Sequence, residues 1–364
     1  MPRLTKRKRS QKKRPVSDDS DDYNAPTADE WATLPTYQKF VVTEGDQDRA
    51  DDEDREEHVF KMGDVVLLLP QTSTVEEAEV LEDCEYWVAK IRDIRSRVDG
   101  SVWARVQWYY SPSDVACIVK SFKTNVCGKY ERIFSDHYDY VHVDSFSGQT
   151  AMTRLKSDDV IQEYIGEEEF YCRYNFEHLA RRLLPKQNAF ACPTCAEPYS
   201  PDNSDHTRLM HFCPRPSCRK YYHERCLKAL KRQPRSVETL QMITTWPDTD
   251  KKESLLELLS PTHVQRKEDS SVVPDFLGSL PDELVKVAEQ PIVRGAAFRN
   301  GGVGGNVSYV VSARRMMYGV LQGSTIPEDW FTHVNIATAV VSIKMGAKKK
   351  TISAFVCPKC NSVI

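Results

Sequence analysis

Apolar and polar residues alternate in short runs between positions 58 and 180, and turn-forming residues separate these runs. The clearest are "DVVLLL" (64–69), "YWVAKIRDI" (86–94), "SVWARVQWYY" (101–110) and "YVHVDSF" (140–146). Apolar, β-branched and aromatic residues with a period of two, bounded by Gly and Pro, are typical of strands. The pattern predicts a small β-rich barrel or sandwich over about 58–180, with a short closing helix in "EHLARRLLP" (177–185).

The stretch from 227 to 350 follows a helical period instead. "SLPDELVKVAEQ" (279–290) has a capping-box spacing, "IPEDWFTHV" (326–334) begins with a helix-starting Pro, and six apolar residues recur on one helical face: Tyr309, Ala313, Met316, Met317, Val320 and Leu321. "RNGGVGGNV" (299–307) lacks both the third Gly of a dinucleotide motif and the lysine of a phosphate loop. We therefore predict a mainly helical region that contains a flexible glycine-rich loop.

The first 57 residues have little apolar pattern and a divided charge. Residues 1–14 carry eight basic and no acidic residues, whereas 17–57 carry fifteen acidic and three basic residues. Blocks of like charge with few apolar side chains cannot bury enough surface to fold, so we predict that 1–57 is mostly disordered. The run "KRKRSQKKR" (6–14) is typical of nuclear import signals and is also suited to contact with DNA phosphates.

The totals favour a globular protein of more than one domain. The chain has 364 residues, of which 40% are hydrophobic and 28% charged, and this length has room for two or three domains. It contains no apolar run of 18 residues and no apolar segment near its start, so we expect neither a membrane partner nor a secretion signal. Eleven cysteines in such a chain favour reduced thiols and metal sites over disulfides.

Eight residues at metal-ligand spacing stand out among the cysteines and histidines. They occur in "CPTC", "CPRPSC", "YYHERC" and "CPKC" and are Cys192, Cys195, Cys213, Cys218, His223, Cys226, Cys357 and Cys360. A structural zinc ion takes four nitrogen or sulfur donors, so eight ligands predict two zinc ions as cofactors. The terminal pair needs two partners from the upstream cluster, although 130 residues separate it from Cys226.

The order of these ligands, together with Phe355 two residues before the last pair, resembles a PHD finger. The resemblance implies interleaved sites, with one zinc ion held by Cys192, Cys195, His223 and Cys226 and the other by Cys213, Cys218, Cys357 and Cys360. The C-x4-C spacing and the long gap depart from the family pattern. A self-folding insertion in that gap is tolerable, because the cost of loop closure grows only logarithmically with length. A RING-like ubiquitin ligase is the alternative for this ligand order.

Blocks of the β-rich region resemble a BAH domain. They are "FKMGDVVLLLP", "YWVAKIRDI", "ARVQWYYSP", "ERIFSDHYDYVHVDSFSG" and "EEEFYCRYNF", in the order of that family, and the finger follows directly. This arrangement is similar to the BAH–PHD chromatin readers of fungi and plants. The fold class we expect is α+β multidomain, with a disordered tail (1–57), a BAH domain (58–180), and a split PHD-like finger (188–226 and 351–364) around a mostly helical insertion (227–350).

The BAH resemblance implies an aromatic cage for a methylated lysine, formed by Trp87, Trp108 and Tyr110. A quaternary ammonium has no proton to donate, so ring faces select it by cation–π attraction. Trp108 and Tyr110 share one face of a strand with Val102, Ala104 and Val106, which leaves open whether the two rings lie in the core or emerge from it.

Further positions carry over from the two families. Asp136 and His137 match residues that contact the histone backbone, and a possible cage in the finger would consist of Tyr199, Met210 and Tyr221. The resemblance implies a nuclear, non-enzymatic protein that binds a histone tail or nucleosome, recognises a repressive trimethyl-lysine mark of histone H3, and acts in gene silencing with co-repressor or chromatin complexes. We expect no small-molecule substrate. A methyl-independent chromatin scaffold is the second alternative.

Overall fold

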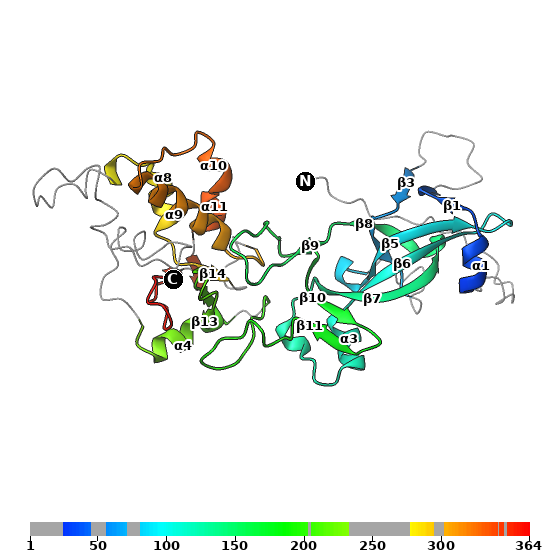
Figure 1. Cartoon of the computed structure of the whole chain (residues 1–364), viewed down its shortest axis with the longest axis horizontal. Coiled ribbons are helices and arrows are strands. Elements are labelled where there is room, and N and C mark those ends of the chain that lie inside the picture. Colours follow the sequence, from blue (N-terminus) through cyan, green and yellow to red (C-terminus); the bar gives the residue numbers. More distant parts are fainter. Residues whose placement is uncertain are drawn as a thin grey trace, which may run out of the picture. The chain divides into compact units, whose positions relative to one another are not determined.

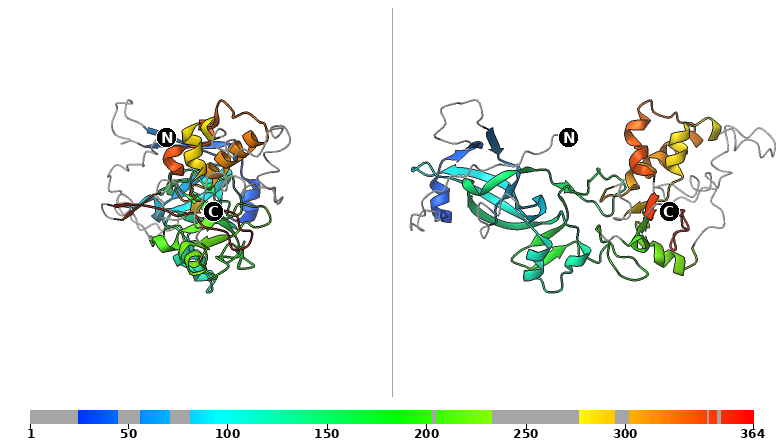
Figure 2. Two further views of the ribbon diagram at one scale, coloured as in Figure 1. Left: turned by 90° about the vertical axis from the view of Figure 1, so that its left-hand side faces the viewer. Right: turned by 180° about the vertical axis from the view of Figure 1, so that it is seen from behind.

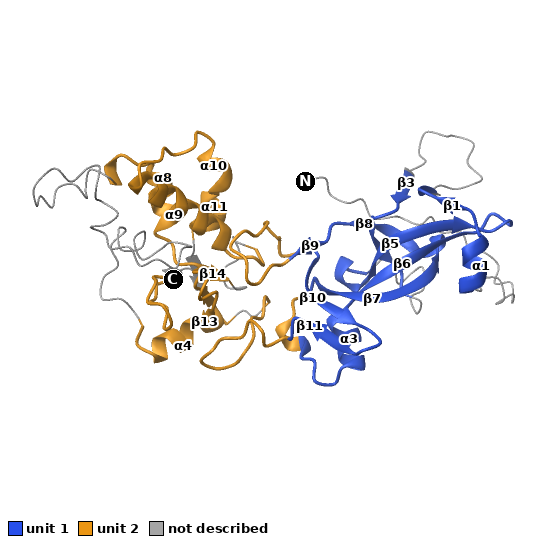
Figure 3. Cartoon of the chain, viewed as in Figure 1, with its two compact units in different colours: residues 1–124, 129–154, 169–186 blue, residues 125–128, 155–168, 187–364 orange. Residues whose placement is uncertain are grey.

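The computed structural model describes residues 25–44, 56–70, 81–202, 205–232, 277–294, 302–340, 342–345 and 348–364. These residues form two compact units (Figure 1). Unit 1 comprises residues 1–124, 129–154 and 169–186, and unit 2 comprises 125–128, 155–168 and 187–364 (Figure 3). Figure 2 shows the strands of unit 1 and the helices of unit 2 from two further sides.

Unit 1 is built on a nine-stranded sheet. Seven strands follow the order β11-β10-β7-β6-β5-β4-β8, with β1 pairing with β5 and β9 pairing with β10. The strands of this sheet are β1 (Thr36–Tyr37), β4 (Val65–Leu68), β5 (Trp87–Ser96), β6 (Val102–Tyr110), β7 (Glu131–His142), β8 (Phe146–Thr150), β9 (Thr153–Arg154), β10 (Tyr171–Glu177) and β11 (Arg182–Leu184). The four predicted apolar runs thus correspond to β4, β5, β6 and the end of β7 with β8.

One face of this sheet forms the main core of unit 1. Alternate residues of the central strands are fully buried there, as the period of two requires. The cluster consists of Phe40, Phe60, Val66, Leu68, Ala89, Ile91, Ile94, Ala104, Val106 and Phe146. Short helical segments join the strands: η2 (Asp83–Glu85), α3 (Pro112–Ile118), η3 (Thr124–Val126) and η4 (Val143–Ser145).

The prediction that 1–57 is disordered is wrong for residues 25–44 and 56–57. These residues form α1 (Ala28–Thr33), β1, β2 (Lys39–Glu44) and the start of β3 (Glu56–Lys61). Trp31 is buried, packs against Tyr140 with 4.5 Å between ring centroids and the rings tilted by 34°, and donates its indole N–H to Asp93. The prediction failed because it rested on the acidic composition of the segment and gave no weight to the few apolar side chains that anchor the segment to the sheet. The basic run 6–14 lies outside the described residues.

The predicted helix at 177–185 is also wrong. Residues 171–184 form a hairpin in which β10 pairs antiparallel with β11, from Asn175 opposite Leu184 to Glu177 opposite Arg182. Arg181 adopts a positive φ of 50° in the turn. The apolar pattern of "HLARRLL" suits a helix locally, but pairing with the neighbouring strand prevails over that local preference.

Unit 2 combines a small sheet with a group of helices. Its three-stranded sheet has the order β13-β12-β14, and a separate hairpin pairs β15 with β16. The elements are η5 (His206–Arg208), β12 (Met210–Phe212), β13 (Tyr221–His223), α4 (Glu224–Ala229), α8 (Asp282–Ala288), β14 (Val293–Arg294), α9 (Val307–Leu321), α10 (Trp330–His333), α11 (Ile336–Ala339), β15 (Ser342–Met345) and β16 (Lys348–Thr351). The predicted α+β fold class is confirmed.

Two segments of unit 2 differ from the predicted organisation. Residues 155–168 were expected in the β-rich domain but cluster with the finger and its insertion. The glycine-rich loop is packed rather than flexible where it is described, since a Cβ on Gly302 would lie 1.9 Å from the Ile165 carbonyl oxygen. No helix within the described ranges is long and apolar enough to cross a membrane.

Candidate functional site

Two groups of four metal-ligand side chains lie in unit 2. In the first, the ligand atoms of Cys192, Cys195, His223 and Cys226 all lie within 4.8 Å of one another. Cys192 and Cys195 occupy a tight turn in which Ala196 N–H donates to the Cys192 carbonyl, and Ala196 has a φ of 58°. His223 ends β13, and its Nδ1 is 3.3 Å from the Cys195 sulfur.

The second group joins the upstream cysteines to the end of the chain. Cys213, Cys218, Cys357 and Cys360 have their sulfurs within 4.8 Å of one another, with 3.3 Å between Cys213 and Cys360 and 3.7 Å between Cys218 and Cys357. The terminal pair repeats the geometry of the first turn: Asn361 N–H donates to the Cys357 carbonyl, and Asn361 has a φ of 59°.

These donor sets fit zinc. Tetrahedral coordination with Zn–S bonds near 2.3 Å puts sulfurs about 3.8 Å apart, close to the observed sulfur spacing. The first group offers three thiolates and one imidazole, the second offers four thiolates, and most of the eight side chains are buried. Closed four-donor groups of this kind hold structural rather than catalytic zinc. The prediction of two structural zinc ions is confirmed, and the ligand groups interleave along the chain as the PHD resemblance implies.

A C-terminal strap, residues 355–364, holds the second group together. Phe355 and Ile364 exchange two backbone hydrogen bonds of 2.8 Å, which brings the two ends of the strap side by side. Arg232, just after α4, donates to the Cys357 carbonyl at 3.0 Å and to the Asn361 side chain at 2.6 Å. Arg314 of α9 donates to the Val363 carbonyl at 3.0 Å. The strap therefore connects the zinc ligands to the helices of the insertion.

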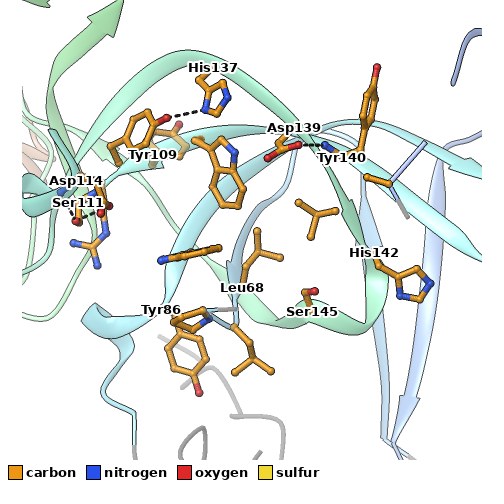
Figure 4. A pocket seen from close by; sticks show the side chains of 18 of the residues that line it. Leu68, Tyr86, Tyr109, Ser111, Asp114, His137, Asp139, Tyr140, His142 and Ser145 are labelled. Atoms are coloured by element: carbon orange, nitrogen blue, oxygen red, sulfur yellow. Dashed lines mark hydrogen bonds between the residues drawn. The ribbon is translucent and has the colours of Figure 1, made fainter. Parts of the chain in front are cut away.

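The second candidate site is a pocket of about 770 Å³ in unit 1. Trp87, Trp108 and Tyr110 all line it. The strand register explains why they meet: Trp108 lies opposite the small Ala89, and Trp87 is two residues from Ala89 on the same face. The two indoles meet edge to face at 5.7 Å with an interplanar angle of 87°. Figure 4 shows Tyr86 and Leu68 across the pocket from His137 and Asp139.

The structure resolves whether these rings lie in the core or emerge from it. Ala104 and Val106 are fully buried, while Trp108 is partly buried against the same core cluster and Tyr110 is half-buried. Trp87 is 38% exposed. The rings thus stand at the edge of the core, with one side supported by apolar packing and the other facing the pocket.

A bulge in β7 shapes one wall of the pocket. The register between β6 and β7 shifts at this point. Gln107 pairs with Tyr138, but Tyr109, two residues further along β6, pairs with Phe134, four residues away on β7. The buried Gln107 amide donates to the freed Ser135 carbonyl at 2.6 Å, and the His137 N–H donates to the Ser135 hydroxyl at 2.8 Å. Bulges change the direction of side chains next to binding sites, and this bulge places the His137 side chain against Tyr110.

Asp136 and His137, predicted to contact a histone backbone, take part in contacts within unit 1. The Tyr110 hydroxyl lies 2.7 Å from His137 Nδ1, and His137 lines the pocket. The His137 ring stacks on the His178 ring at 4.4 Å, and the Asp136 carboxylate accepts the backbone N–H of His178 at 2.7 Å. His178 was missed by sequence reasoning, because it lies in the segment predicted to be helical.

Three carboxylates and one guanidinium, that of Arg132, line the pocket, so its formal charge is negative. The carboxylates are those of Asp114, Asp139 and Asp144. Burial, followed by the charges of Asp114 and Asp139, raises the pKa of Tyr110 to about 12, so its hydroxyl stays protonated at neutral pH. Burial, with a smaller contribution from His178, lowers the pKa of His137 from its ordinary 6.5. A neutral His137 can accept the Tyr110 hydroxyl proton as a hydrogen bond.

The possible cage in the finger is not open in this structure, which corrects that prediction. Tyr199, Met210 and Tyr221 are 6%, 0% and 2% exposed. The Tyr199 hydroxyl donates to the Val303 carbonyl at 2.9 Å, and the Tyr221 hydroxyl donates to the Ser157 carbonyl at 2.7 Å. Segments that are distant in the sequence cover these side chains. The spacing of the metal ligands does not predict which segments these are.

No protein-family model matches the chain. The chain is 24% identical over 196 residues to the "Chromatin remodeling protein EBS" of Arabidopsis thaliana, which covers 54% of this chain and 74% of that protein. Among solved structures, it is similar to the crystal structure of the yeast Rsc2 BAH domain, with 17% identity and a TM-score of 0.24. That match covers 35% of this chain and spans about half (49%) of the yeast chain.

Proposed function

We propose that this chain, in which a BAH-type β domain precedes a PHD-type two-zinc finger, is a nuclear chromatin-binding protein that recognises a methylated histone tail. The resemblance to BAH–PHD proteins is confirmed by the two zinc-ligand groups and by the similarity to a chromatin remodeling protein. The observation that carries the proposed recognition is the meeting of Trp87, Trp108 and Tyr110 in one pocket.

The chemistry of the pocket suits a trimethylammonium group. Such a group cannot donate a hydrogen bond, and it is only weakly hydrated compared with an ammonium, so ring faces attract it without a large desolvation cost. The two perpendicular indoles offer a face and an edge from different strands, and Tyr110 adds a third ring. The nearby carboxylates of Asp114 and Asp139 reinforce the attraction for a cation.

The remaining parts of the proposal come from the family resemblance. The ligand is a repressive trimethyl-lysine mark of histone H3 within a nucleosome, and the protein acts by binding rather than by catalysis. The basic run 6–14 supports a nuclear location and contact with DNA phosphates, which are sequence-independent and sensitive to salt. Co-repressor or chromatin complexes are the expected protein partners.

Titration calorimetry with the full chain tests this function. We expect a trimethylated H3 tail peptide to bind at least about tenfold more tightly than the unmethylated peptide, since desolvated cation–π contacts contribute up to about 2 kcal/mol each. Trp108→Ala removes one indole and should abolish this preference, while Trp108→Phe keeps a ring face and should retain part of it. Leu179→Ala is the matched control, because Leu179 is 94% exposed and does not line the pocket.

Equal affinities for the two peptides would contradict methyl-lysine recognition and leave a methyl-independent chromatin scaffold as the function. Unchanged selectivity in Trp108→Ala would contradict the assignment of the cage. Circular dichroism of each variant separates a loss of binding from a loss of folding.

A further inference from the structure

The finger's small sheet is completed by a strand from the insertion. β12 pairs on one side with β13, which is a neighbour in the sequence, and on the other with β14, which lies about 80 residues further on. Met210 lies opposite Arg294 and His211 opposite Val293 in an antiparallel register. β14 and β13 both belong to unit 2 (Figure 3). An extended segment thus binds the edge of β12 as a peptide ligand binds the edge of a sheet.

The side chain of Arg294 fills the aromatic part of this surface. It is 1% exposed, and its guanidinium carbon lies 5.2 Å from the ring centroid of Tyr221 and 5.9 Å from that of Phe212. The two rings stack on each other at 4.5 Å. Tyr221 is a residue of the predicted finger cage, so the cation of this chain lies where a ligand cation would have been expected.

Carbonyl oxygens hold the polar edge of the same guanidinium. Arg294 Nε donates to the Gly304 carbonyl at 2.9 Å, and one Nη donates to the Lys156 carbonyl at 3.4 Å. No carboxylate pairs with Arg294 within the described part of the chain. A planar, weakly hydrated cation with several donors satisfies rings and carbonyls at once, whereas a compact lysine ammonium would bury a strongly hydrated charge. The surroundings of Arg294 therefore suit a guanidinium group better than an ammonium group.

The surroundings fix the strand in this place. Asn306 is fully buried, and its side chain accepts the Val293 N–H at 2.8 Å while donating to the carbonyls of Pro291 and Ala339. A Cβ on Gly305 would lie 2.0 Å from the Val293 carbonyl oxygen, so only glycine allows this close approach. β14 is therefore fixed against the finger by specific contacts on several sides.

We infer that the finger has a binding site for an extended segment bearing an arginine side chain, and that the chain fills this site with its own Val293–Arg294. This site lies in unit 2 and does not depend on the proposed methyl-lysine pocket of unit 1. An external tail can use the same surface only by displacing β14. The finger therefore serves to attach the insertion, and the β14-covered edge of β12 is not available to a histone tail in the wild-type chain.

Chemical rescue tests the site. We expect Arg294→Ala to lower the thermal unfolding temperature of unit 2, and methylguanidinium chloride at a concentration too low to denature the wild-type chain to restore a measurable part of the loss. The same concentration of methylammonium or sodium chloride should restore none. Arg294→Lys should behave like the alanine variant. Arg182→Ala, at an exposed ion pair with Glu177 in unit 1, is the control and should show no rescue. Full stability of Arg294→Lys, or equal effects of the three salts, would overturn the inference.

A second measurement avoids any variant that could fail to fold. With methyl-13C methionine in the wild-type chain, the Met210 signal, assigned from Met210→Leu, reports on the buried edge of β12. Saturating trimethylated and unmethylated H3 tail peptides should leave this signal unchanged, because β14 keeps the edge occupied. A shift of the Met210 signal on addition of either peptide would show that the surface takes external ligands and would contradict the inference.

Discussion

At the scale of single residues, Tyr110 links the aromatic pocket to a stacked pair of histidines. Its hydroxyl lies 2.7 Å from His137 Nδ1, and its ring is parallel to both the His137 and His178 rings. A neutral His137 orients the Tyr110 ring by accepting its hydroxyl hydrogen. A protonated His137 cannot accept that hydrogen, and it places a positive charge beside the expected ligand cation.

Methyl-lysine binding should therefore weaken in acid. The pKa of His137 is lowered by burial and by His178, so His137 stays neutral down to pH values below its ordinary pKa of 6.5. We expect the affinity for a trimethylated peptide to be constant from about pH 8 to about pH 6.5 and to fall as His137 protonates at lower pH. Fluorescence anisotropy with a labelled peptide measures this profile.

The control for this profile is His137→Gln, which keeps an acceptor near Tyr110 and does not titrate. The other titratable groups facing His137 are Tyr110, His178, Asp136 and Asp139, and His178→Gln separates the second histidine from the first. An equally steep fall of affinity in His137→Gln would mean that a different group causes it.

The residues of the proposed cage could be picked out from the sequence because they belong to recognisable blocks. Trp87, Trp108 and Tyr110 follow from the BAH resemblance, and the structure brings them to one pocket. The sequence did not predict the roles of His178 and Arg294, because the residues around them come from strands and loops that are distant in the sequence. A local pattern cannot report which non-local segment will cover a side chain.

At the scale of elements, the glycine-rich loop is a packing device between segments of unit 2. Gly302 has a φ of 59°, and its Cα approaches the Ile165 backbone, while Gly305 approaches β14. Val303 N–H donates to the Ile165 carbonyl at 2.9 Å, and the Val303 carbonyl accepts the Tyr199 hydroxyl. The loop is therefore part of the support for β14 and the finger.

Gly302→Ala should destabilise unit 2 by about 2 kcal/mol or more, because it combines a positive φ with a severe overlap against backbone. We expect the unfolding temperature of unit 2 to fall by several degrees in differential scanning calorimetry. Gly278→Ala is the matched control, since no heavy atom lies within 4 Å of its added Cβ and its φ is not positive. Similar unfolding temperatures for the two variants would show that the backbone around Gly302 can move to accept a Cβ, and would contradict its role in close packing.

The elements differ in how well the sequence predicted them. The helical period of the apolar residues between 309 and 321 correctly predicted a helix, which is α9, Val307–Leu321. A long amphipathic pattern predicts a helix more reliably than a short one does. The predictions for 177–185 and for residues 25–44 were wrong for opposite reasons. The first segment has a helical pattern but pairs with a strand, and the second has a charged composition but is anchored by Trp31 and Phe40.

At the scale of the whole molecule, the finger is closed only by the end of the chain. The C-terminal strap supplies two of the four ligands of the second zinc group and binds Arg232 and Arg314. Metal binding and folding are coupled in such sites, because the ligands are brought together only in the folded state. In the sequence, the insertion therefore lies between the two ligand-bearing parts of the finger rather than after them.

Deleting residues 357–364 should lower the zinc content from two ions per chain toward one and destabilise unit 2. Inductively coupled plasma mass spectrometry measures the zinc content, and limited proteolysis measures the exposure of the insertion. Cys360→Ser tests the same site with a single change, and Cys117→Ser is the control, because Cys117 is an exposed thiol outside both groups. Two zinc ions in the truncated chain would contradict the pairing of the strap with Cys213 and Cys218.

In the proposed function, the pocket of unit 1 selects the charge of a trimethylated lysine by its aromatic rings. The most direct measurement compares the affinity of a trimethyl-lysine H3 tail peptide with that of the same peptide carrying the neutral tert-butyl isostere, by titration calorimetry at one ionic strength. The two groups have nearly the same shape and differ in charge. A preference for trimethyl-lysine of about tenfold or more is expected from cation–π attraction. Equal affinities would show that the pocket recognises only an apolar shape and would contradict the cage formed by Trp87, Trp108 and Tyr110.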